Sequence, residues 1–207
     1  MNIISDHDYE TIVLRLEYLI SKALMFGYPT EVIESRLANS EHLIKLESND
    51  INMLLYEDSY KIFNRIFFES SDANEQNIEL NWVNNWISQA YIYLIDKFQI
   101  TFELLFGYLP IKKMFDMFKL YHEMDNSNLG NYLESMISKT NPLKLFLKLK
   151  SISVSELSNR TGINLNTLSS YTSGNREIKN MSFENAIKIA NILKIRPQSL
   201  LLNCCNN

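Results

Sequence analysis

The chain has 207 residues, of which 46% are apolar, and a net charge of −4. This length can bury one large core or two small ones, and the presence of only five Gly and four Pro argues against a turn-rich all-β fold and favours an all-α fold. No apolar run approaches the ~20 residues that cross a bilayer, and the first residues lack the pattern of a signal peptide, so we expect a cytoplasmic protein.

Apolar residues recur at helical spacing through the first 141 residues. Gly27 and Pro29 should end the first helix, and Thr30 can cap the second. The helix that begins at Asn81 is apolar over a wide arc and is therefore expected at the centre of its domain. The expected helices cover residues 12–26, 30–37, 59–68, 81–98, 102–109, 111–121 and 129–137, with an interrupted stretch at 39–52 and a polar surface loop at 70–77.

From residue 142 onwards the expected elements become short and have clear ends. Pro142 can open a helix that runs to about Lys150. Ser153 and Glu156 have the spacing of a capping box, in which each side chain caps the backbone N–H of the other residue. The helix that starts there should end at Gly162.

A second short helix follows directly. Asn164 can cap it, and Gly174 can end it shortly after Thr172. Two short helices joined by a turn that contains Gly are typical of a helix-turn-helix.

The segment 156–176 resembles the Xre family of Cro and C1-type repressors. The shared features are Glu156-Leu157, the turn Gly162, the run from Thr167 to Tyr171, and Gly174-Asn175-Arg176. The resemblance continues through 182–193 and 197–202, which correspond to the fourth and fifth helices of that family. It implies a five-helix DNA-binding domain at 142–207. The helical periodicity of residues 1–141 and their excess of acidic residues predict an all-α protein with an acidic helical dimerisation or partner domain in that range, which loosely resembles uncharacterised bacterial antitoxin and regulator proteins.

The resemblance also implies roles for individual residues, because the second helix of such a pair lies in the major groove. The bases would be read by Asn164, Leu165, Asn166, Ser169 and Ser170. Asn can pair with adenine and Leu can touch a thymine methyl group, which indicates an A·T-leaning site. The phosphates would be contacted by Thr167, Asn175, Arg176, Lys179, Lys148 and Lys150.

Two features depart from the family pattern. Val154 stands where many members carry a phosphate-binding Gln, and Leu147 and Thr172 stand where many form an Arg–Glu pair. The expected reading helix also carries no Lys or Arg. We therefore expect modest affinity for each subunit, an apolar contact in place of the ion pair, and dependence on dimers.

The charge is divided unevenly along the chain. Residues 142–207 hold nine Lys and Arg against three acidic residues, a net charge of +6, which leaves −10 for residues 1–141. A basic segment can approach a phosphate backbone that would repel an acidic one. The expected function is a transcriptional regulator, a repressor in the form of a homodimer, on double-stranded DNA with an inverted repeat. The alternative is an antitoxin whose N-terminal domain neutralises a toxin while the C-terminal domain regulates the operon.

Catalysis is not expected. His7, His42 and His122 lie far apart, and the chain has no phosphate-binding Gly loop. The spacing of Arg36 and His42 resembles the ribonuclease motif of HEPN proteins. We prefer the interpretation that Arg36 is an exposed residue and His42 a partly buried structural residue. Cys204 and Cys205 are adjacent and lack further ligands, so no metal, cofactor or disulfide is expected.

Overall fold

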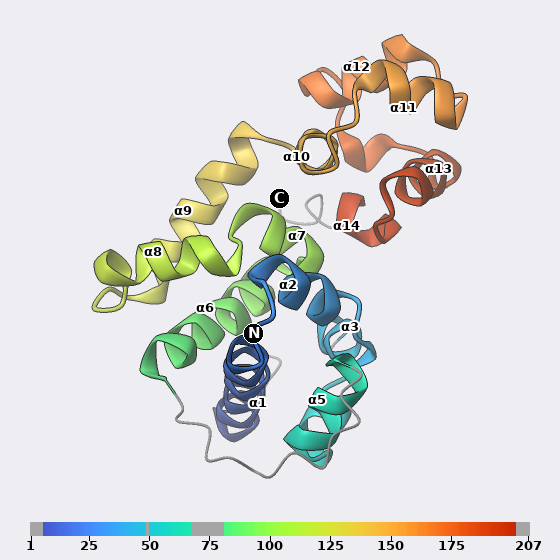
Figure 1. Cartoon of the computed structure of the whole chain (residues 1–207). Coiled ribbons are helices and arrows are strands. Elements are labelled where there is room, and N and C mark those ends of the chain that lie inside the picture. The colour runs from blue at the N-terminus through green and yellow to red at the C-terminus, as the bar shows by residue number, and fades with distance from the viewer. Residues whose placement is uncertain (1–5, 49, 68–80, 202–207) are drawn as a thin grey trace.

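The computed structural model describes residues 6–48, 50–67 and 81–201, and all regular structure in these ranges is helical (Figure 1). None of the helices in these ranges combines the length and apolar character needed to cross a membrane. The helices are α1 (Asp6–Met25), α2 (Thr30–Ala38), α3 (Glu41–Glu47), α4 (Asn52–Tyr56), α5 (Ser59–Phe67), α6 (Trp82–Phe98), α7 (Phe102–Tyr108), α8 (Ile111–Tyr121), α9 (Asn126–Lys139), α10 (Pro142–Leu149), α11 (Val154–Thr161), α12 (Leu165–Ser173), the 3₁₀ helix η1 (Ile178–Asn180), α13 (Phe183–Leu193) and α14 (Pro197–Leu201). The predicted all-α fold class is confirmed.

Helix α6 is the centre of the N-terminal region, as its wide apolar arc predicts. It packs against α1, α7, α8 and α9. Tyr91 is fully buried and its hydroxyl donates to the carbonyl of Leu109 at 2.8 Å. The contact between α6 and α1 also contains polar pairs: Asn85 donates to Glu17 at 2.6 Å and Asn84 donates to Ser21 at 2.8 Å. These directional bonds fix the register of two helices whose apolar contact alone would tolerate sliding.

Several helix ends differ from the prediction. Thr30 is the first residue of α2 and not its cap, a position taken by Pro29, which offers no side-chain acceptor. The stretch predicted as interrupted contains two short helices, α3 and α4. Helix α9 begins at Asn126, earlier than predicted, because the Asp125 carboxylate caps the N–H of Ser127 at 2.7 Å. The loop predicted at 70–77 and the two cysteines lie outside the described residues.

The Arg36–His42 pair serves the core of the N-terminal region. The side chain of His42 is buried, more completely than predicted, and its Nε2 lies 2.8 Å from the Glu57 carboxylate. Arg36 is half-buried rather than exposed, since its guanidinium donates to the carbonyl of Phe67 at 2.6 Å and lies over the ring of Tyr28. These contacts give both residues a structural role.

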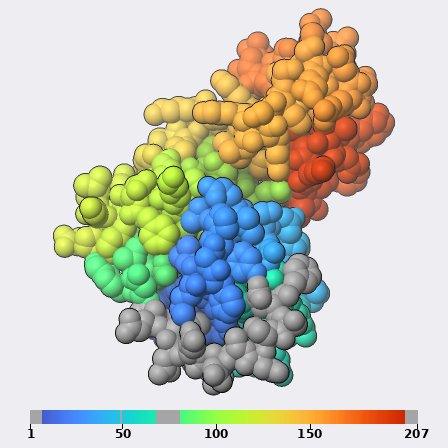
Figure 2. All heavy atoms as spheres, in the orientation of Figure 1, coloured from blue at the N-terminus to red at the C-terminus, as the bar shows by residue number. Residues whose placement is uncertain are grey.

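The five helices from α10 to α14 form the other end of the molecule. Their shared core contains Phe146, Leu157, Leu168, Ile189 and Leu193. Figure 1 shows α11 and α12 at the end of the molecule farthest from α1 and α5, and Figure 2 shows the same residues as a protruding lobe. Helix α7 contacts α10, and this contact is one of those that join the lobe to the N-terminal region.

Candidate nucleic-acid interface

Helices α11 and α12 are joined by the tight turn that the sequence predicts. The Ser153 hydroxyl accepts from the N–H of Glu156 at 3.1 Å and starts α11. Gly162 has φ +70° and ends it, a backbone conformation that is strained for residues with a Cβ. Asn164 then caps α12 by accepting from the N–H of Asn166 at 2.8 Å.

Only half of the predicted capping box, the bond accepted by Ser153, forms. The Glu156 carboxylate is predicted to accept from the N–H of Ser153. It instead pairs with Arg160 at 2.6 Å, one turn further along α11. An Arg at the i+4 position is a stronger attraction for an exposed carboxylate than a neutral N–H.

Helix α12 has a buried side and an outer side. Leu168 (0% exposed) and Tyr171 (4% exposed) face the core. Asn164, Asn166 and Ser169 are exposed, and Leu165, an apolar residue, remains 44% exposed. An exposed Leu beside three polar side chains is a suitable surface for base edges and thymine methyl groups.

Two predicted contact residues are less available. Ser170 is half-buried, and its hydroxyl donates to the carbonyl of Asn166 at 2.8 Å within the helix. Thr167 is half-buried as well. Ser170 therefore presents less hydrogen-bonding capacity to the outside than Ser169 does.

The predicted phosphate contacts surround α12. Asn175, Arg176 and Lys179 are exposed in the segment that follows it, and Lys148 and Lys150 are exposed at the end of α10. Arg176 extends over the ring of Tyr171, with 5.7 Å from its guanidinium carbon to the ring centroid. Lys179 is paired with Glu177 at 3.0 Å, which reduces the charge it presents.

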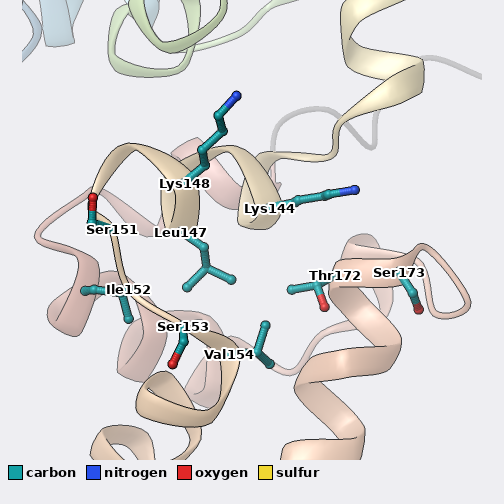
Figure 3. Close-up of a pocket in the computed structure, with 9 residues that line it drawn as sticks. All are labelled: Lys144, Leu147, Lys148, Ser151, Ile152, Ser153, Val154, Thr172 and Ser173. Atoms are coloured by element: carbon teal, nitrogen blue, oxygen red, sulfur yellow. The ribbon is translucent and has the colours of Figure 1, made fainter.

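A hollow of about 580 Å³ opens between α10, the start of α11 and the end of α12 (Figure 3). Leu147 and Thr172, the positions at which the family often has an ion pair, line it together with Val154. Lys144 and Lys148 stand at its rim and extend away from the centre. An apolar floor with a cationic rim can accept the sugar–phosphate edge of a nucleic acid strand.

A residue outside the family's ion-pair positions links α10, the first helix of the lobe, to α12. Asn141 caps α10 by accepting from the N–H of Lys144 at 2.9 Å, and its amide donates to the carbonyls of Tyr171 at 2.9 Å and Thr172 at 3.3 Å. Sequence reasoning missed Asn141 and Lys144. An Asn directly before Pro142 is a signal for a helix cap, but its reach to α12 depends on the tertiary structure.

The electrostatics of the lobe favour an anionic partner. Each of its three acidic residues forms an ion pair with a basic side chain of the same segment, at 2.6 Å for Glu156, 3.0 Å for Glu177 and 2.7 Å for Glu184. Among the described residues, Lys144, Lys148, Lys150 and Arg176 form no ion pair. In the same described ranges no cluster of three His, Cys, Asp or Glu residues could hold a metal ion.

Comparison with known proteins agrees with this geometry. Residues 142–201 match the family described as the Cro/C1-type HTH DNA-binding domain. The chain has no match among curated proteins or among solved structures. The exposed outer side of α12, its caps and its cationic surroundings are the parts with which such a domain contacts DNA. Residues 142–201 of this chain therefore form a Cro/C1-type helix-turn-helix DNA-binding domain, as the resemblance to the Xre family predicts.

Proposed function

We propose that this protein is a sequence-specific transcriptional regulator, a cytoplasmic repressor that binds an inverted-repeat operator as a homodimer. The observation that carries the proposal is the accessible outer side of α12, which lies at the far end of the molecule from α1 and α5 (Figure 1). Domains of the Cro/C1 type bind DNA and are not enzymatic, and the proposal includes no catalytic step.

In this proposal the outer side of α12 reads bases. The amide of Asn166 can make paired hydrogen bonds with adenine, and Asn164, whose side-chain oxygen caps α12, can donate from its amide nitrogen. Leu165 can touch a thymine methyl group, and Ser169 can accept or donate. Ser170 plays a smaller part in base reading and Thr167 a smaller part in phosphate contact, since both are half-buried. An A·T-rich half-site follows from this set of side chains.

Contacts with the DNA backbone come from the flanks of α12. We assign the phosphate contacts to Lys148, Lys150, Asn175, Arg176 and Lys179, all of which are exposed, and we add Lys144 at the rim of the hollow (Figure 3). Because α12 has no Lys or Arg, each subunit gains little affinity from its reading helix beyond base contacts. Two subunits on half-sites ~34 Å apart provide the remaining affinity.

We assign the dimer contact to the acidic region at 1–141, and DNA binding to 142–207. The charge of −10 in the first region repels phosphates and keeps it away from the duplex. This division leaves α12 of each subunit free to face the same side of the DNA.

The test is a selection of bound duplexes from a randomised pool. The wild-type protein should enrich an inverted repeat with A·T-rich half-sites. Asn166→Ala should bind the selected duplex about 10-fold more weakly and lose preference at one base pair, because one paired contact is removed. Asn159→Ala, an exposed Asn on α11, is the matched control and should bind as the wild type does. Selection of the same sequence by Asn166→Ala, or no enrichment by the wild type, would refute the proposed reading helix.

A second function is favoured by one feature of the N-terminal region. Trp82 and Leu120 are large apolar side chains that remain mostly exposed on α6 and α8, and exposed apolar residues are common where proteins bind partners. An antitoxin that neutralises a toxin through this region would co-purify with the toxin at a fixed ratio. Purification of the chain alone from its native cells would count against this function.

A further inference from the structure

The last helix of the DNA-binding domain is docked onto the N-terminal region. Ser199 and Leu200 of α14 are completely buried. Arg196, which precedes α14, is only 20% exposed, and its partner Glu47, at the end of α3, is 7% exposed. Residues about 150 positions apart in the chain are thus brought into one buried contact.

The contact is a network of hydrogen bonds between five residues, which we name the clasp: Glu47, Thr101, Glu103, Arg196 and Ser199. Both terminal nitrogens of Arg196 donate to the carboxylate of Glu47, at 2.5 Å and 2.9 Å. The Glu103 carboxylate accepts from the backbone N–H of Arg196 at 3.1 Å and from the Ser199 hydroxyl at 2.9 Å. The hydroxyls of Thr101 and Ser199 lie 2.9 Å apart.

The clasp is anchored in α7. Glu47 also accepts from the N–H of Phe102, the first residue of α7, at 2.6 Å. Thr101 accepts from the N–H of Leu104 at 3.2 Å and thereby caps the same helix. The bidentate geometry and the shared helix start leave the Arg196–Glu47 pair little freedom to turn.

Helix α7 holds the DNA-binding domain at a second point. Its Gly107 lies against α10 so closely that a Cβ there would come 3.0 Å from Leu145 and 3.3 Å from Leu149. The Tyr108 hydroxyl donates to the carbonyl of Thr140, just before α10. Because the DNA-binding domain contacts the N-terminal region through both α10 and α14, it cannot rotate about either contact alone.

We propose that Glu47 is a positioning residue for DNA binding: through Arg196 it fixes the direction of α12 relative to residues 1–141, and so sets the spacing between half-sites that the dimer accepts. The inference rests on the proposed function, in which residues 1–141 join the two subunits. An apolar contact of the same size would hold the domain but would permit sliding, whereas directional bonds between buried groups permit one arrangement. Because the side of α14 that carries Ser199 and Leu200 is buried, that side is not available to join two DNA-binding domains directly.

The experiment compares two kinds of synthetic duplex built from the half-site obtained by the selection above. One kind carries a single half-site. The other carries two inverted half-sites whose separation is changed in single base-pair steps around one helical turn, ~10.5 base pairs. The variants are Glu47→Gln and Arg196→Gln, with Glu41→Gln as the matched control, since Glu41 lies on the same helix in an exposed pair with Lys45. Helical circular dichroism and thermal unfolding identify any variant that does not fold.

The wild type and Glu41→Gln should prefer one separation over a separation changed by half a turn by at least ~10-fold. Glu47→Gln should bind the single half-site as the wild type does, within about two-fold, and lose most of the preference for separation. The double variant should lose no more than either single variant, because both changes break the same contact.

Two outcomes would overturn the inference while leaving the proposed function intact. A folded Glu47→Gln protein that keeps the wild-type preference for separation shows that the clasp does not position α12. An equal loss of affinity for both kinds of duplex shows a purely structural role. A wild-type protein that enriches no sequence in the selection refutes the proposed function itself.

Discussion

Three buried or half-buried glutamates cap helices that are distant in the sequence. Glu34 of α2 accepts from the N–H of Ile111 at 2.6 Å, at the start of α8, where Pro110 offers no capping side chain. Glu47 and Glu103 do the same for Phe102 and Arg196. A carboxylate is favoured at a helix start by the unpaired N–H groups and by the helix dipole. Each glutamate therefore satisfies a backbone donor and joins two elements.

Glu34 makes stability depend on pH. Burial, opposed in part by the hydrogen bond from Ile111 and reinforced by Glu31, raises the pKa of Glu34 to about 7 from an unfolded value of 4.5. The folded state therefore binds the Glu34 proton more tightly than the unfolded state does, so protonation of Glu34 stabilises the fold. This contribution to the free energy of unfolding is fully present below about pH 4.5 and is lost as pH rises through about 7. Glu34→Gln keeps an acceptor for Ile111 and should gain roughly 1–2 kcal/mol over the wild type between pH 5 and pH 8, after discounting for solvent screening.

The measurement is urea unfolding at a series of pH values. Glu10→Gln, which removes an exposed carboxylate on α1, is the control and should show no such gain. A Glu34→Gln curve parallel to that of the wild type would contradict the assigned pKa.

At the scale of elements, α12 is held at both ends by groups outside it. Asn164 caps its start, and Asn141 donates to the carbonyls at its end. Gly174, with φ +82°, then turns the chain away. The link from Asn141 occupies the role that an Arg–Glu pair has in many members of the Xre family, since Leu147 and Thr172 stand at those positions and line the hollow.

Asn141→Asp separates the two roles of this residue. Aspartate is as good a helix cap as asparagine, so the start of α10 should be unaffected. Its carboxylate, however, would face the carbonyls of Tyr171 and Thr172 with no proton to donate, and it would oppose the negative end of the α12 dipole. The free energy of unfolding should fall by about 1–2 kcal/mol, measured by urea unfolding.

The control for this prediction is Ser182→Asp. Ser182 caps α13 and is exposed, and its side chain accepts from the N–H of Asn185. That change should alter stability by less than ~0.5 kcal/mol. If Asn141→Asp were equally harmless, the bonds from Asn141 to α12 would have no energetic weight.

At the scale of the whole molecule, charge and structure divide in the same place. Residues 142–207 carry a charge of +6, while the region at 1–141 carries a charge of −10. The clasp joins these two parts through a Glu–Arg pair and thus uses their opposite charges within the molecule. The phosphate backbone should therefore meet the lobe alone.

The salt dependence of binding tests this division. A plot of log affinity against log salt has a slope proportional to the number of phosphates contacted, and Lys148→Ala should reduce the slope by about one. Lys119→Ala removes an exposed lysine from α8, in the acidic region, and should leave the slope unchanged. Equal effects of the two substitutions would place the acidic region against the DNA.

Local patterns were sufficient to predict most helices and the helix-turn-helix. Helix α8 has the predicted ends, and Ser153, Gly162 and Asn164 occupy the predicted capping positions. Two of the errors fall where two interactions compete for one group: Glu156 pairs with Arg160 instead of its predicted capping partner, and the Ser170 hydroxyl donates to a carbonyl of its own helix. Such competition is decided by geometry that spacing alone does not specify.

By itself, the sequence determined that this protein is all-α, that residues 142–201 form a helix-turn-helix, and which side of α12 is exposed, because caps, Gly turns and helical periodicity act over a few residues. The tertiary structure alone decided that Glu47, Glu103 and Arg196 meet, that Asn141 reaches α12, and that His42 is buried against Glu57. These contacts join residues far apart in the chain, and such a contact exists only when the packing of whole helices has brought both partners together and excluded water from between them.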